Sequence, residues 1–105
     1  MNPYLALAFA ILAEVIATSA LKATHSFTRL IPSTITVVGY AAAFYCLSLA
    51  IKTIPVGIAY GIWSGLGIVL ISMAAYVLYQ QSLSPQQMLG LALIVAGVVV
   101  VNVRW

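Results

Sequence analysis

The sequence "AILAEVIATSALK", residues 10–22, places one glutamate in the middle of an otherwise apolar stretch. Glu14 is also the only acidic residue among the 105 residues of the chain. An apolar run that ends at a lysine is typical of a helix crossing the hydrocarbon core of a membrane, which takes about 20 residues. The stretch therefore predicts a membrane-spanning helix with a carboxyl group near its middle.

The whole chain has the composition of a membrane protein. Hydrophobic residues make up 65% of it and charged residues 5%, and the mean hydropathy is +1.19, whereas about a quarter of the residues in a soluble domain are charged. The apolar residues are spread along the chain, so a cleaved signal peptide is not expected. Cys46 is the only cysteine and His25 the only histidine, so we expect no internal disulfide, no metal site and no cofactor. His25 is expected in a loop.

Charged residues and turn formers divide the chain into four predicted spans. No charged residue lies between Thr53 and Val103, and this segment is long enough for two spans. The turn between the two spans is predicted at "QQSLSPQQ", residues 80–87. Asn2-Pro3 is a typical helix start. The prediction is an all-α integral membrane protein with a single transmembrane domain, residues 1–105. Its helices span about residues 4–21, 30–51, 57–79 and 86–103. The connectors are short, so neighbouring helices are expected to be antiparallel.

The basic residues give almost no instruction about orientation in the membrane, although Lys and Arg normally accumulate in cytoplasmic loops. With four spans, one side of the membrane receives Lys22 and Arg29, and the other receives Lys52 and Arg104. This tally of two against two predicts insertion both ways, and two opposite copies can pair as an antiparallel homodimer. The alternative is that other factors fix one orientation.

Glycines in the last two spans are candidates for close helix packing. Gly90 and Gly97 share one face of the fourth span, and small residues let helices approach closely in lipid, either within one subunit or between two. Gly57, Gly61 and Gly65 follow a four-residue spacing in the third span. Gly65 and Gly67 lie so close together that they can instead mark a bend.

Glu14 is the main candidate for a functional group. An ionised carboxylate near the middle of the membrane costs several kcal/mol, and no Lys or Arg lies within a span to neutralise it. We therefore expect Glu14 to bind a proton or a cation that arrives from outside. Helical spacing places Ala10, Ala17 and Thr18 on its face, where small side chains leave room. The alternative is a protonated acid with a purely structural hydrogen bond.

Aromatic residues in two other spans can complete a site around Glu14. Tyr40 and Phe44 are four residues apart in the second span, and Tyr60, Trp63 and Ser64 cluster in the third. Aromatic faces attract organic cations, so the pattern predicts a site for a hydrophobic cation that competes with protons. The alternative is that these rings only fill space or lie at the membrane interface.

Five segments resemble the small multidrug resistance transporters, and the resemblance extends over essentially the entire chain. They are "MNPY" (1–4), "AILAEVIAT" (10–18), "SFTRLIPS" (26–33), "IPVGIAYGIWSG" (54–65) and "GIVLIS" (67–72). The resemblance implies a four-helix subunit that forms an antiparallel homodimer in the bacterial cytoplasmic (inner) membrane. It also implies export of hydrophobic and quaternary ammonium cations in exchange for protons.

The resemblance also implies roles for individual residues. Glu14 would bind proton and substrate alternately, with Tyr60, Trp63, Tyr40 and Phe44 around the substrate, while Gly90 and Gly97 would form the dimer contact and Gly65 and Gly67 the helix bend. Ala43 stands where a serine is common in the family. Guanidinium-exporting relatives typically have Gly and Trp at the positions of Ala10 and Ala17, so the chain resembles the multidrug branch, with guanidinium or polyamine export as the alternative.

Three other classes of function fit less well. A proton or cation channel needs a polar file across the membrane, which these spans lack. A small non-transporting membrane subunit explains four helices but not the carboxyl group. Enzymatic chemistry is not expected because no nucleophile has a base partner, and no nucleic-acid partner is expected either.

Overall fold

The fold consists of four long helices joined by short connectors. The computed structural model describes residues 2–103, in which the helices are α1 (Pro3–Leu21), α2 (Leu30–Ala50), α3 (Val56–Tyr79) and α4 (Pro85–Val103), with a 3-10 turn, η1 (Lys22–Thr24), after α1. Each helix is long and apolar enough to cross a membrane, which confirms the predicted class. The helices begin and end within one residue of the predicted spans. Arg104, one of the four residues in the charge tally, lies outside the described residues.

The helix ends follow the capping signals in the sequence. The Asn2 side chain accepts hydrogen bonds from the backbone N–H of Tyr4 (2.8 Å) and Leu5 (3.4 Å), which confirms the predicted start of α1. Before α4, the backbone N–H of Ser84 donates to Gln87 Oε1 (2.9 Å) and the backbone N–H of Gln87 donates to Ser84 Oγ (3.2 Å). This reciprocal capping pair begins α4 at the end of the predicted turn.

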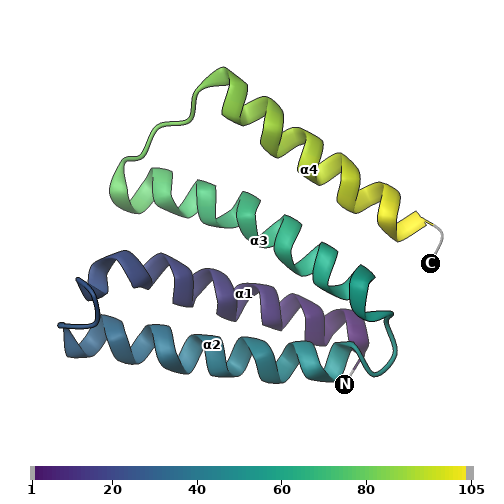
Figure 1. The fold of residues 1–105 in the computed structure, drawn as a ribbon, viewed down its shortest axis with the longest axis horizontal. Coiled ribbons are helices and arrows are strands. Elements are labelled where there is room, and N and C mark those ends of the chain that lie inside the picture. Colours follow the sequence, from purple (N-terminus) through teal and green to yellow (C-terminus); the bar gives the residue numbers. More distant parts are fainter. Residues whose placement is uncertain (1, 104–105) are drawn as a thin grey trace.

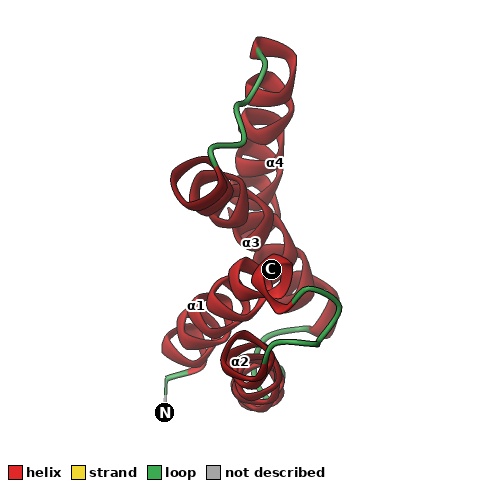
Figure 2. Ribbon diagram, turned by 90° about the vertical axis from the view of Figure 1, so that its left-hand side faces the viewer, coloured by secondary structure: helices red, strands yellow, loops and turns green. Residues whose placement is uncertain are grey.

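The helices run alternately in opposite directions and form a flat slab of 43 × 35 × 16 Å (Figure 1). α1 packs against both α2 and α3, and α3 packs against α4. Both ends of the described chain therefore lie at the same end of the slab. Figure 2 shows α4 standing away from α1 and α2, and no residue of α4 is buried.

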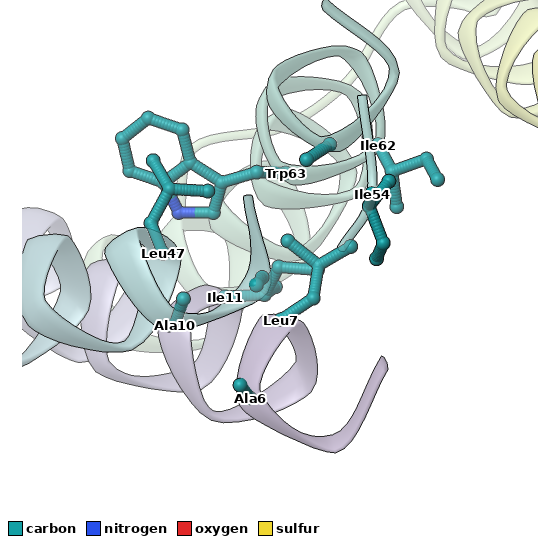
Figure 3. Packing of buried hydrophobic residues seen from close by; sticks show 10 residues of the cluster. Ala6, Leu7, Ala10, Ile11, Leu47, Ile54, Ile62 and Trp63 are labelled. Atoms are coloured by element: carbon teal, nitrogen blue, oxygen red, sulfur yellow. The ribbon is translucent and has the colours of Figure 1, made fainter. Parts of the chain in front are cut away.

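The hydrophobic core lies where α1, α2 and α3 meet (Figure 3). Ile54 belongs to the connector between α2 and α3, yet it is only 1% exposed and so anchors the connector to the core. Trp63 reaches the same cluster from α3. The other buried side chains that Figure 3 labels are Ala6, Leu7, Ala10, Ile11, Leu47 and Ile62.

α1 and α2 approach each other most closely around Gly39. A Cβ atom built on Gly39 would lie 2.8 Å from the Cβ of Ala17, closer than real Cβ atoms pack, and 3.2 Å from the carbonyl oxygen of Ala13. One turn earlier, Thr36 Oγ1 donates to the Ala17 carbonyl oxygen (3.2 Å). Small residues and this hydrogen bond therefore help to hold the two helices together, as is common in membranes.

Candidate functional site

One oxygen of the Glu14 carboxyl group is held by a chain of hydrogen bonds from α2. Thr18, one turn further along α1, donates its hydroxyl to Glu14 Oε1 (2.9 Å). Thr18 Oγ1 also lies 2.6 Å from Tyr40 Oη. Since a hydroxyl carries only one proton, and Thr18 gives it to Glu14, Tyr40 is the donor of the second bond. The order Tyr40 to Thr18 to Glu14 fixes the position of Oε1.

The other oxygen of Glu14 has no such partner. Oε2 is buried and makes no hydrogen bond to any residue between positions 2 and 103. It lies against Gly67 of α3, on which a Cβ atom would be only 2.9 Å from Oε2. Because buried polar atoms are nearly always satisfied, Oε2 is the candidate position for a ligand, and Gly67 leaves the room for this oxygen.

A cavity of about 190 Å³ lies beside the carboxyl group. It brings together Glu14 and three of the predicted residues, Tyr60, Trp63 and Ser64, and its wall is completed by Ile68 and Ile71. No basic side chain among residues 2–103 lines it. Within this part of the chain, the cavity thus offers one carboxyl group and aromatic surface, without a basic side chain to neutralise the charge.

The aromatic residues form a connected group around Trp63, which is 7% exposed. Its ring meets Tyr60 edge-on, with centroids 5.3 Å apart, and Phe44 of α2 in the same manner at 5.4 Å. Phe44 thus contacts the cavity-lining residue Trp63. Tyr40 is connected to the cavity-lining residue Glu14 by its hydrogen bond to Thr18. The indole nitrogen of Trp63 is buried without a hydrogen-bond partner among the described residues, so it remains available as a donor.

Two alanines do not lie where their spacing suggested. Ala10 is fully buried in the core cluster and Ala17 is fully buried, with its Cβ facing Gly39 of α2. Neither residue lines the cavity beside Glu14. The expectation that these alanines open the space beside Glu14 is corrected: Ala17 instead lets α2 approach at Gly39, Ala10 belongs to the core, and Gly67 of α3 leaves room for Glu14 Oε2.

The glycines of α3 and α4 differ in their surroundings. α3 continues through Gly65 and Gly67 as one helix, and a Cβ atom on Gly65 would lie 2.5 Å from Val98 Cγ2 of α4. Gly65 therefore allows the contact between α3 and α4, and a bend at these two glycines stays a prediction. Gly90 and Gly97 have no atom within 4 Å of a built Cβ, so their face is open and its role in dimerisation also stays a prediction.

Comparison with known proteins gives one consistent result. Residues 2–94 match the model of the family described as "Small Multidrug Resistance protein". The chain is 55% identical to the quaternary ammonium compound-resistance protein QacF of Klebsiella aerogenes and 53% identical to QacE of Escherichia coli, each over 97% of this chain and 93% of the relative. It is 49% identical to the multidrug transporter EmrE of Escherichia coli K12 over the same shares.

Proposed function

The chain belongs to the Small Multidrug Resistance family, and from this premise we propose that it is an antiporter that exports hydrophobic and quaternary ammonium cations in exchange for protons. It is a multi-pass membrane protein of a transporter family and not an enzyme, as expected, and such a protein lies in the inner membrane of bacteria. Relatives named for resistance to quaternary ammonium compounds support the proposed class of substrate.

The observation that carries the proposal is the free oxygen of Glu14. Oε2 is buried beside a cavity lined by aromatic residues and by no basic side chain. In this setting the carboxyl group is stable when it carries a proton or when an organic cation lies next to it. Because both ligands use the same carboxyl group, binding of one displaces the other, and this competition is the coupling between proton and substrate.

We further propose an antiparallel homodimer, which the size of the cavity and the open face of α4 support. A cavity of about 190 Å³ is smaller than the range of about 300–1,000 Å³ typical for drug-sized ligands, and two such cavities joined across a dimer fall within it. Gly90 and Gly97 lie on a helix without a buried residue, where a second copy can pack closely. The balanced charge tally supports opposite insertion of the two copies.

Opposite insertion can be tested by changing the charge tally. Two lysines added to the turn at residues 80–87 should bias the chain toward one orientation, and this variant expressed alone should lose most of its transport activity. The control carries two glutamines at the same places. Accessibility of tags on the wild-type termini from only one side of the membrane would contradict the antiparallel dimer.

The proposed substrate class is tested with purified protein in liposomes. We expect binding of tetraphenylphosphonium and aromatic quaternary ammonium ions in the micromolar range, and uptake driven by a proton gradient. Guanidinium, which is small and strongly hydrated, needs a tight set of polar partners, and Ala43 offers no polar side chain. Selective transport of guanidinium without a response to aromatic cations would overturn the proposed substrate class.

A further inference from the structure

A second cavity lies between α1 and α3, one helical turn from Glu14 toward the loop that joins α1 to α2. Its volume is about 140 Å³. It is distinct from the cavity beside Glu14, although both share Ile71 as a wall. The remaining wall is built from the end of α1 and the second half of α3, mainly by Thr18, Ser19, Lys22, Ala75 and Tyr79.

Thr18 joins this second cavity to the carboxyl group. It lines the cavity and donates its hydroxyl to Glu14 Oε1 at 2.9 Å. Positions 14, 18 and 22 follow one another at four-residue spacing, so Glu14 and Thr18 lie along one face of α1 and Lys22 follows directly after its last residue. This face leads from the middle of the predicted span to its end.

The second cavity is polar enough and large enough to hold water. Its volume is well above the roughly 15 Å³ that one water molecule requires. Ser19 lines it, and Ser19 Oγ is buried with no hydrogen-bond partner among the described residues. A buried hydroxyl without a protein partner is the kind of group that an internal water satisfies.

Tyr79 closes the cavity at the end of the helices. Its hydroxyl donates to the Ser19 carbonyl oxygen at 2.5 Å, and Lys22 Nζ lies 5.2 Å from the centre of its ring. The ring is therefore held across the seam between α1 and α3 by a hydrogen bond on one side and a cation–π contact on the other. Both contacts can be removed without changing any residue that lines the cavity beside Glu14.

We propose that the second cavity is a water-filled proton route that connects Glu14 to the membrane surface, with Thr18 as the relay and Tyr79 as the gate. The inference rests on the proposed function, in which Glu14 exchanges protons. In uptake, a hydronium ion in the cavity gives a proton to Thr18 Oγ1 and becomes water, while the original Thr18 hydroxyl proton moves to Glu14 Oε1, so Thr18 ends neutral and Glu14 becomes the acid. Release is the reverse transfer, from Oε1 through Thr18 to water.

The route separates the path of the proton from that of the bulky cation. The cation would occupy the cavity lined by Tyr60 and Trp63, whereas the proton would pass on the other side of Thr18. The titratable groups beside this route are Glu14, Lys22 and Tyr79 along α1 and α3, Tyr40 from α2, and Tyr60 at the neighbouring cavity. In an antiparallel dimer the two copies of the route would open on opposite sides of the membrane.

The test measures how fast protons displace a bound cation. Protein loaded with tetraphenylphosphonium at high pH is mixed rapidly with acidic buffer, and cation release is followed together with proton uptake by an indicator dye. Ala75→Leu fills the second cavity and should slow both signals about tenfold, while the equilibrium affinity for the cation at high pH stays within about twofold. The matched control is Ala42→Leu at an exposed position of α2, which should behave like the wild type.

A second variant tests the route in the opposite direction. Tyr79→Phe keeps the ring but removes its hydrogen bond to Ser19. This variant should therefore take up protons several-fold faster than the wild type. The result tests the proton route even if Ala75→Leu fails to fold. Wild-type rates in Tyr79→Phe, or equal rates in Ala75→Leu and Ala42→Leu, would overturn the proton route. If the wild-type protein itself exchanges no protons on cation release, the proposed antiport fails instead.

Discussion

The two sides of α1 are built in opposite ways. Toward α2, the helix presents small buried residues, and Gly39 and Thr36 meet Ala17 at close range. Toward α3, it presents Glu14 and Thr18, and cavities of about 190 and 140 Å³ lie along the seam. The first side gives α1 a fixed position, and the second leaves space for ligands to come and go. Hydrogen bonds that reach from α2 on the packed side thus hold Oε1 of the Glu14 carboxyl group. Its other oxygen, Oε2, makes no hydrogen bond to a described residue on the open side.

The largest effect is expected on the open side, from Glu14→Gln. The amide can still accept the hydrogen bond from Thr18, so the fold should persist, but it can neither lose a proton nor attract a cation. Proton-driven uptake of tetraphenylphosphonium into liposomes should fall to the level of empty liposomes. Glu14→Asp is the control, because it keeps the acid and should retain part of the activity. Coupled transport by Glu14→Gln would mean that Glu14 is not the shared site.

On the packed side, Gly39→Ala should cost stability rather than coupling. The new methyl group would lie 2.8 Å from the Cβ of Ala17, and overpacking of this kind costs about 1–3 kcal/mol, partly offset by the better helix propensity of alanine. Unfolding of the solubilised protein by denaturant would measure the change in free energy. Gly61→Ala, where nothing lies within 4 Å, is the control and should not destabilise; equal behaviour of the two variants would mean that the α1–α2 contact is not tight.

Gly67→Ala brings the same change to the open side. Its methyl group would lie 2.9 Å from Glu14 Oε2 and should displace the carboxyl group, so the affinity for tetraphenylphosphonium should fall about tenfold, or about 1.4 kcal/mol. Equilibrium binding at high pH measures this loss.

Gly65→Ala is the matched control for Gly67→Ala. It meets Val98 of α4 and not the carboxyl group, so it should disturb the α3–α4 contact with less effect on the affinity of the folded protein. A larger loss of affinity from Gly65→Ala than from Gly67→Ala would show that Gly67 does not act on Glu14 directly.

The smallest effect is expected from Thr36→Val, again on the packed side. The substitution removes the hydrogen bond to the Ala17 carbonyl oxygen, which should lower the free energy of unfolding by about 1 kcal/mol and leave cation binding unchanged. Thr34→Val is the control, since Thr34 is exposed and bonds only to Leu30 of its own helix. A loss of cation affinity in Thr36→Val would indicate that the two sides of α1 are coupled.

The helices could be predicted from the sequence because apolar length, charge and capping residues act locally. The association of Glu14 with Tyr60, Trp63 and Ser64 could also be anticipated, because a lone carboxyl group in a membrane needs polar or aromatic neighbours. The roles of Gly39 and Gly67 could not, because a close contact depends on which helices become neighbours and on their rotation. The same reason explains Ala10, which became part of the core, and Ala17, whose small size lets α2 approach.

The central claim, that one carboxyl group binds either a proton or a cation, is tested most directly by counting protons released on binding. Tetraphenylphosphonium is added to solubilised protein in weakly buffered solution, and the pH change is recorded. Competition for this carboxyl group predicts proton release by the wild-type protein that disappears at a pH high enough to ionise Glu14 beforehand, and no release by Glu14→Gln at any pH. Cation binding by the wild-type protein without proton release at every pH would contradict it.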